Sequence, residues 1–350
     1  MCLYPKLIDN PKYRKNKKNG GNIPPVSDKR VLLVPVGCGK CMECIKMKQR
    51  EWTVRLLEEF RTDPQCKFIT LSFSEDSLIK LEDLLKVKVP TGIRKTITMK
   101  NGKTRNYYNY EEKKLYHKLT GYNLDNALAK KGMRLFLERW RKKYGKSVKH
   151  WFVSELGTKN TERIHLHGIL FTDKTKQEIE DRWQYGNLWE GDYVNEGTIK
   201  YCCKYLAKPD IVHKEYKPIV LTSDGIGANY IKRLDSKINA FNGKDTKQYY
   251  RSRERFKMAL PIYYRNALYT EAQREELWLH KLDEQVRYVD GVKIDVSKTD
   301  KHYYLKLFEA RKLNKQLGYG DDTINWERRK YENKRRSLIK RRRYAVQKKR

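Results

Sequence analysis

Two histidines stand one residue apart in the segment RIHLHGIL, residues 163–170. Side chains alternate between the two faces of a β-strand, so His165 and His167 project from one face and the apolar residues beside them from the other. Glu155 ends the preceding strand candidate and is the candidate third ligand. Two imidazoles with a carboxylate suit manganese or magnesium and leave positions open for a phosphate oxygen. The strand pattern alone fits a pair of solvent-facing histidines equally well.

Two tyrosines four residues apart form a second group, in YCCKY at residues 201–205. The spacing predicts a short helix from Thr198 to Lys208, and positions i and i+4 share a helix face. Tyr201 and Tyr205 can therefore present two phenols to one site, with Lys204 next to them. A phenol has a pKa near ~10 and is a weak nucleophile until a cation stabilises its phenolate. For this motif alone, a core or interface pair of tyrosines is the favoured interpretation.

Three cysteines, Cys38, Cys41 and Cys44, recur at every third position beside glycines. This spacing is typical of a metal knuckle, and Cys2 is the candidate fourth ligand of a structural zinc ion. An iron–sulfur site is the rival interpretation, although the usual fourth cysteine before a proline is missing. Buried free thiols near a helix start are the third. The remaining cysteines are expected to be simple buried residues: Cys66, Cys202 and Cys203.

Hydrophobic periodicity predicts the elements that position these groups. Alternating helix and strand patterns indicate an α+β sandwich in which helices cover one face of a sheet. The predicted elements are a helix from Met42 to Arg61, a strand from Lys67 to Phe73, a mobile hairpin or insertion from Pro90 to Asn109, a helix through Met133 and Tyr144, and strands at Lys149–Glu155 and Ile164–Phe171.

The charge of the chain points to a polyanionic partner. Its 350 residues include 78 Lys and Arg against 43 Asp and Glu, a formal net charge of +35. This excess favours nucleic acid binding over a merely basic surface of the ribosomal or structural kind. No stretch approaches the ~20 apolar residues of a membrane span. The odd cysteine count and the polar, lysine-rich start predict a reducing cytoplasm.

Composition divides the chain into three expected domains. Residues 1–65 hold an arm that we expect to be extended or loosely ordered to about Arg30, then the cysteine cluster and a helix. Residues 66–235 hold the histidine and tyrosine groups. Residues 236–350 form a basic, tyrosine-rich region, and its end, from Arg328 on, has Glu332 as its one acidic residue. That end is predicted to be a flexible or conditionally helical nucleic-acid tail.

The order of these motifs resembles that of the HUH endonucleases, whose name describes histidine, hydrophobic residue, histidine, and which carry a tyrosine motif downstream. More closely, the chain is similar to the replication initiators of small single-stranded DNA bacteriophages of the microvirus family, gokushovirus branch. The segments that carry this resemblance are Met1–Pro5, Cys38–Arg55, the histidine strand, the two-tyrosine helix, Gly225–Gly227 and Ala259–Tyr264.

The resemblance implies a central antiparallel sheet flanked by helices, with the two histidines on a middle strand. It further implies metal-dependent, site-specific nicking of single-stranded DNA at a viral replication origin, in the cytoplasm of a bacterial host. A divalent ion on His165, His167 and Glu155 would polarise the phosphate while Tyr201 or Tyr205 attacks it. The products would be a 5′-phosphotyrosine link and a 3′-hydroxyl for a host polymerase, and the second tyrosine would serve strand rejoining. Lys204 would steady the phosphate.

No ATP site is expected. Gly145-Lys146-Ser147 resembles the end of a phosphate-binding loop, but Trp140 stands where that motif needs glycine. Unwinding is therefore expected from a host helicase. Two other functions remain open from the sequence: a relaxase or transposase of the same HUH class, and a non-catalytic basic nucleic-acid-binding protein with a zinc knuckle.

Overall fold

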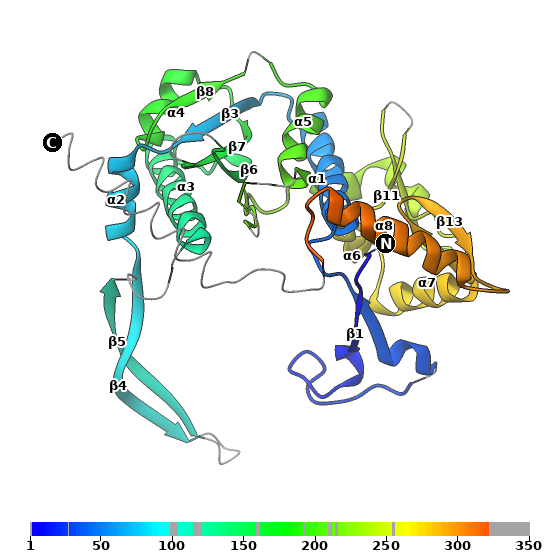
Figure 1. The fold of residues 1–350 in the computed structure, drawn as a ribbon. Helices are drawn as coiled ribbons and strands as arrows, with labels where there is room; N and C mark the ends of the chain where they lie inside the picture. Colours follow the sequence, from blue (N-terminus) through cyan, green and yellow to red (C-terminus); the bar gives the residue numbers. More distant parts are fainter. Residues whose placement is uncertain are drawn as a thin grey trace. The chain divides into compact units, whose positions relative to one another are not determined.

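A computed structural model of the chain describes residues 2–26, 28–98, 104–114, 119, 121–158, 162–191, 193–208, 210, 212–213, 216–253 and 256–321. They form two compact units (Figure 1). The first unit combines Met1–Cys66, Val194–Glu215 and the described part of Asp224–Asn325, and the second combines Lys67–Tyr193 with Tyr216–Ser223. The basic tail predicted from Arg328 on lies outside the described residues.

The second unit is built on a five-stranded antiparallel sheet with the strand order β8-β3-β7-β6-β9. The predicted α+β class, with an antiparallel sheet flanked by helices, is confirmed, and the histidine strand β7 is the middle strand. The elements of this sheet and its helices are β3 (Lys67–Ser72), α2 (Glu75–Asp83), α3 (Tyr122–Tyr144), β6 (Lys149–Leu156), β7 (Ile164–Phe171), α4 (Lys176–Trp183), β8 (Leu188–Glu190) and β9 (Val220–Thr222).

One face of this sheet is covered by helices, as the sequence predicts. Alternate residues of β7 point to this face, and three helices contribute side chains to the same apolar core (Figure 1). On α3, Met133, Phe136 and Trp140 are spaced so that they share one side of the helix. The fully buried residues of this core include Ile69, Leu71, Phe136, Phe152, Ile164, Leu166, Leu170, Ile179 and Trp183.

Gly168 of β7 lies at the most crowded point of the sheet. It pairs with Phe152 of β6 on one side and with Ile69 of β3 on the other. A Cβ at this position would lie 2.2 Å from the backbone oxygen of Trp151 and 2.5 Å from the ring of Phe152. A backbone oxygen in a paired strand cannot move aside, so this position requires glycine.

A long hairpin extends the second unit beyond the sheet. Strands β4 (Lys86–Thr98) and β5 (Thr104–Lys114) pair antiparallel, with register shifts near Pro90 and Ile93. The predicted hairpin is therefore confirmed, and its strands extend further than the predicted range of residues 90–109. Side chains described at 91–98 and 106–111 are exposed.

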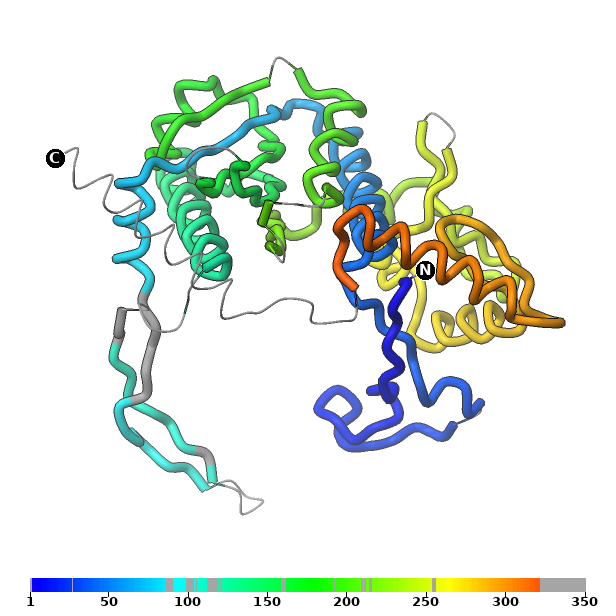
Figure 2. The backbone as a smooth tube through the Cα atoms, in the orientation of Figure 1, coloured from blue at the N-terminus to red at the C-terminus, as the bar shows by residue number. Residues whose placement is uncertain are grey.

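The first unit brings together stretches that are far apart in the sequence, as the colours of Figure 2 show for the blue and orange ends of its chain trace. Its centre is helix α1, which packs against α5. The predicted helices at 42–61 and 198–208 are confirmed as α1 and α5. The elements of the unit are β1 (Lys6–Asp9), η1 (Pro11–Tyr13), η2 (Lys29–Leu32), β2 (Leu33–Val36), α1 (Met42–Thr62), α5 (Glu196–Ala207), η3 (Ala228–Lys232), η4 (Leu234–Asn239), β10 (Tyr249–Arg251), β11 (Lys257–Ala259), α6 (Ile262–Leu268), α7 (Glu271–Asp283), β12 (Val286–Val289), β13 (Val292–Asp295) and α8 (Lys301–Gln316).

The N-terminal stretch is more ordered than the sequence predicts. Strand β1 pairs with β2, and Tyr13 is buried with its hydroxyl donating to Glu275 of α7 at 2.8 Å. Lys12 adds an ion pair with the same carboxylate at 2.9 Å. The expectation of an extended or loosely ordered arm up to Arg30 is therefore wrong for the described residues, because these partners lie far away in the sequence.

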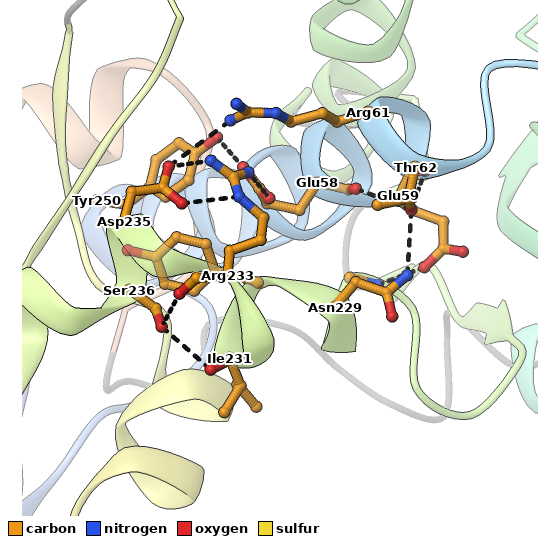
Figure 3. A network of polar contacts seen from close by, with 12 residues as sticks. Glu58, Glu59, Arg61, Thr62, Asn229, Ile231, Arg233, Asp235, Ser236 and Tyr250 are labelled. Carbon is orange, nitrogen blue, oxygen red and sulfur yellow. Dashed lines mark hydrogen bonds and ion pairs between the residues drawn. The ribbon is translucent and has the colours of Figure 1, made fainter.

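Two neighbouring carboxylates of α1 hold the segment that follows Gly225 (Figure 3). Glu58 is fully buried, accepts a hydrogen bond from the Tyr250 hydroxyl at 2.6 Å and forms an ion pair with Arg233. Glu59 accepts from the backbone N–H of Gly227 at 2.7 Å. Burial, followed by the Glu58 carboxylate, raises the pKa of Tyr250. A buried charge is tolerated only when it is paired and hydrogen-bonded, so these contacts fix the segment on α1.

The Gly225-Ile226-Gly227 motif has a structural explanation in the same place. Gly227 has a φ of +74°, and a Cβ there would lie 2.5 Å from the backbone oxygen of Arg55 and 2.8 Å from the Tyr264 hydroxyl. Tyr264 in turn donates to the carbonyl of Gly227 at 2.8 Å. The motif lets a turn approach the backbone of α1 closely.

The fates of the three cysteines outside the cluster differ. Cys202 and Cys203 are buried on α5, as predicted, whereas Cys66 is only partly buried. Among the described helices, none is long and apolar enough to cross a membrane.

Replacing Gly168 by Ala is expected to lower the free energy of unfolding by about 3 kcal/mol, because the added methyl group meets a fixed backbone oxygen. Urea denaturation followed by circular dichroism measures this change. The matched control is Gly92→Ala in the hairpin, where a Cβ would meet no atom within 4 Å. Equal stability of the two variants would contradict the packing described for β7.

Candidate functional site

The pairing of β6 with β7 brings the three predicted metal ligands together. Glu155 is directly opposite His165, and His167 follows two residues later on the same face. One carboxylate oxygen of Glu155, Oε2, lies 3.3 Å from Nε2 of His165 and 2.9 Å from Nε2 of His167. The three ligand atoms lie within 4.8 Å of one another.

Each imidazole is oriented by a contact on its other nitrogen. Nδ1 of His165 lies 3.2 Å from the carbonyl oxygen of Arg163, and Nδ1 of His167 lies 2.9 Å from the hydroxyl of Thr70 on β3. A carbonyl only accepts, so Nδ1 of His165 carries the proton and a neutral ring keeps a lone pair on Nε2. Metal-binding histidines typically donate from one nitrogen in this way while the other binds the ion.

Thr70 is a residue of this site that the sequence analysis missed. It pairs with His167 across β3 and β7, so it lies on the same sheet face. Strand alternation alone places Thr70 on one of the two faces of β3 but does not reveal its neighbour. Only the register of β3 against β7 identifies it.

The electrostatics of the group favour a charged carboxylate. Burial raises the pKa of Glu155, but the hydrogen bonds from His165 and His167 outweigh it and hold the pKa well below its usual range. His167 is buried, while Glu155 and His165 are partly exposed. An ionised carboxylate beside two imidazole nitrogens is a suitable ligand set for a cation.

The spacing of the ligand atoms also fits one small divalent ion. Neighbouring ligands of an octahedral ion with bonds of about 2.1 Å lie about 3 Å apart. The two distances from Glu155 are close to this value. The three residues can therefore hold a metal ion, and they would leave further positions for oxygen ligands.

The two predicted nucleophiles lie together on α5, in the first unit. The hydroxyl of Tyr205 donates to that of Tyr201 at 3.1 Å, and the two ring centroids are 5.5 Å apart. The opposite side of α5 is buried, whereas Tyr201 is 50% exposed and Lys204 is exposed. This exposure argues against a core pair of tyrosines.

Both ends of α5 are anchored. At its start, Asn195 and Thr198 form a capping box, with the Asn195 side chain accepting from Thr198 N–H at 2.8 Å. At its end, the Tyr319 hydroxyl donates to the carbonyl of Ala207 at 2.7 Å. The tyrosines are therefore carried by a helix with no frayed end.

The four predicted cysteine ligands also meet. Cys2 joins the knuckle at the start of α1, and the four Sγ atoms lie within 4.8 Å of one another. All four are free thiols: Cys2, Cys38, Cys41 and Cys44. The group can hold a metal ion.

One comparison with known proteins bears on this part of the chain. A family model described as a replication-associated protein of the ORF2 type matches residues 116–210. That stretch contains Glu155, both histidines and both tyrosines. No curated protein and no solved structure gives a significant match. The family match supports a role in the initiation of replication.

Replacing His167 by Ala is expected to weaken Mn²⁺ binding at least ~10-fold, because one of three protein ligands is lost. Isothermal titration calorimetry measures the affinity. His302→Ala is the matched control, since His302 is an exposed histidine on α8. Unchanged Mn²⁺ affinity of the His167 variant would exclude this group as the ion site.

Proposed function

We propose that this chain starts rolling-circle replication by nicking single-stranded DNA at a specific site through a tyrosine nucleophile. The ligands of a catalytic Mn²⁺ or Mg²⁺ would be Glu155, His165 and His167. The observation that carries this proposal is that a single stretch, matched by a replication-associated family, contains both an oriented carboxylate–imidazole group and two neighbouring phenols.

The bound cation supplies Lewis-acid stabilisation of the charge that develops on the phosphate oxygens. The phenol loses its proton to solvent, and its oxygen attacks the phosphorus of the scissile phosphodiester. The new O–P bond forms as the bond from phosphorus to the 3′-oxygen breaks. The leaving oxygen takes up a proton to become a 3′-hydroxyl, and the strand's 5′-phosphate stays on the tyrosine. A host polymerase would extend the free 3′ end.

The hydrogen bond between the phenols helps to prepare one of them. Tyr205 donates to Tyr201, and a hydrogen bond to the charged form of a group favours that form. We therefore assign Tyr201 as the first nucleophile in this arrangement. The exposed ammonium of Lys204 on the same helix would contact a phosphate oxygen.

The second phenol permits strand rejoining. After one round of synthesis, Tyr205 attacks the regenerated site, and the 3′-hydroxyl that this releases attacks the phosphotyrosine at Tyr201. The phosphodiester forms again and the first phenol is freed. One ester bond replaces another at each step, so the cycle needs no ATP.

The exposed hairpin is a candidate DNA contact for this activity. Tyr107, Tyr108 and Tyr110 on β5 are between 42% and 58% exposed, and Arg94 and Lys95 on β4 are exposed as well. Aromatic rings stack on unpaired bases, and cationic side chains bind the backbone. The hairpin therefore presents both kinds of group that single-stranded DNA needs.

A cationic pocket in the first unit offers a further place for phosphate. Its volume is about 470 Å³, and its charged lining residues are mainly basic. Tyr249 adds an aromatic ring to the wall. The lining residues are Arg61, Tyr230, Asp235, Ile238, Lys247, Tyr249, Arg251, Ser252 and Arg253.

Single-stranded oligonucleotides that tile the replicon encoding this chain, incubated with the protein and Mn²⁺, are expected to give a covalent adduct that survives denaturation. The double variant Tyr201→Phe, Tyr205→Phe removes both nucleophilic oxygens and is expected to abolish the adduct, as gel electrophoresis will show. Tyr288→Phe is the control, because Tyr288 is a partly exposed tyrosine outside α5. No adduct from the unmodified chain would favour a non-catalytic DNA-binding protein, and an adduct from the double variant would move the nucleophile elsewhere.

Replacing Arg94 and Lys95 by Ala is expected to weaken binding of single-stranded DNA and to lower the slope of log affinity against log salt by about 1.4, at about 0.7 per lost phosphate contact. Fluorescence anisotropy at several salt concentrations gives the slope. The control variant, Lys17→Ala with Lys18→Ala, removes the same charge from exposed positions in the first unit. Identical slopes for both variants would remove the hairpin from the DNA contact.

A further inference from the structure

Four thiols gather where the N-terminal segment meets the start of α1. We infer that Cys2, Cys38, Cys41 and Cys44 bind one zinc ion, and that this ion stabilises the unit that carries the tyrosine helix. The inference is separate from the proposed nicking reaction, because it uses different residues in a different compact unit.

The distances between the sulfurs are those of a single tetrahedral ion. With Zn–S bonds of about 2.3 Å, the corners of a tetrahedron lie about 3.8 Å apart. The Sγ atoms of Cys38 and Cys44 are 4.0 Å apart, and those of Cys41 and Cys2 are 3.9 Å apart. A disulfide needs about 2.05 Å, so these separations describe ligands around a common centre and not a bonded pair.

Backbone N–H groups already point at the sulfurs. The N–H groups of Tyr4 and Cys38 donate to Cys2 Sγ at 3.3 and 3.2 Å, and the N–H of Cys41 donates to Cys38 Sγ at 3.3 Å. Such hydrogen bonds stabilise thiolates, which are the form that binds zinc, and they fix the direction of each ligand.

Glycines make the turn around the sulfurs close enough. A Cβ on Gly37 would lie 3.1 Å from Sγ of Cys44 and 3.8 Å from Cβ of Cys2. Gly39 has a φ of +74°, a conformation that favours glycine. The tight knuckle between Cys38 and Cys41 therefore rests on a conformation that other residues rarely adopt.

The sulfur cluster also explains how several distant segments are joined. Cys41 and Cys44 belong to an apolar cluster with Leu3 and with residues of β12, β13 and α8. Arg311 of α8 donates to the carbonyl of Leu3 at 2.8 and 3.0 Å, and Asn314 accepts from the N–H of Met42 at 2.8 Å. An ion on the four thiols would tie these contacts to the first turn of α1, which packs against α5.

Iron–sulfur chemistry fits these distances less well. A [4Fe–4S] cluster binds each cysteine to a different iron, which spreads the sulfurs further apart than one ion does. Here all four lie within 4.8 Å of one another. A single thiophilic ion, for which zinc is the usual occupant of four cysteine ligands, is the better match.

The test uses the full chain, purified without added metal, and elemental analysis by inductively coupled plasma mass spectrometry. One zinc per chain is expected. Cys38→Ser is expected to lose the bound zinc, and the matched control Cys66→Ser, which alters a partly buried cysteine outside the cluster, is expected to keep it. Replacement of zinc by Co²⁺ should give the absorption of a tetrahedral thiolate site in the unmodified chain and in the control.

A second measurement covers the case in which Cys38→Ser fails to fold. Removing the metal from the unmodified chain with a strong chelator is expected to lower Tm by about 10 °C, because binding energy of a structural zinc is folding energy. Zinc should restore Tm, and Mn²⁺ should not. His167→Ala should keep its zinc even if it forms no DNA adduct, which separates this inference from the proposed function.

Three outcomes would overturn the inference: no zinc in the unmodified chain, equal zinc in the Cys38 and Cys66 variants, or iron with acid-labile sulfide in place of zinc. Unchanged Tm after complete metal removal would overturn the stabilising role.

Discussion

The register of β6 against β7 is the constraint on which the metal-binding group depends. Side chains repeat every two residues along a strand, so a shift by one residue would carry Glu155 to the face opposite the histidines. The buried residues on the helix-covered face prevent that shift, because it would expose Leu166 and Leu170. Gly168 adds a steric limit at the point where β6 and β7 are closest. The same packing that stabilises the sheet therefore sets the geometry of its polar face.

In the first unit, buried charge has the corresponding role. Glu58 and Glu59 lie on a helix that would otherwise bury only apolar side chains, and each has a specific partner far along the chain. A carboxylate without such a partner would be costly in this position. The segments after Gly225 are thus held in one arrangement on α1, and α1 in turn supports the helix with the two phenols.

Local patterns in the sequence predicted most of the elements and the groups that lie within them. Strand alternation was enough for His165 and His167, helix periodicity for Tyr201 and Tyr205, and spacing for the cysteine knuckle. Long-range partners were harder to predict. Thr70 depends on a register, the order of the N-terminal stretch depends on Glu275 of a distant helix, and Arg233 has no local signal for its buried partner. The division into three domains stays a prediction.

The anchoring of α5 at both ends has a consequence for whatever strand it meets. A helix with a capped start and a bonded final carbonyl has little conformational freedom left to lose when a ligand arrives. The entropy cost of ordering then falls on the ligand. A nucleic acid that is already folded into a stem with a short loop would lose less entropy than an extended one, so prior shape in the ligand would count alongside its base sequence.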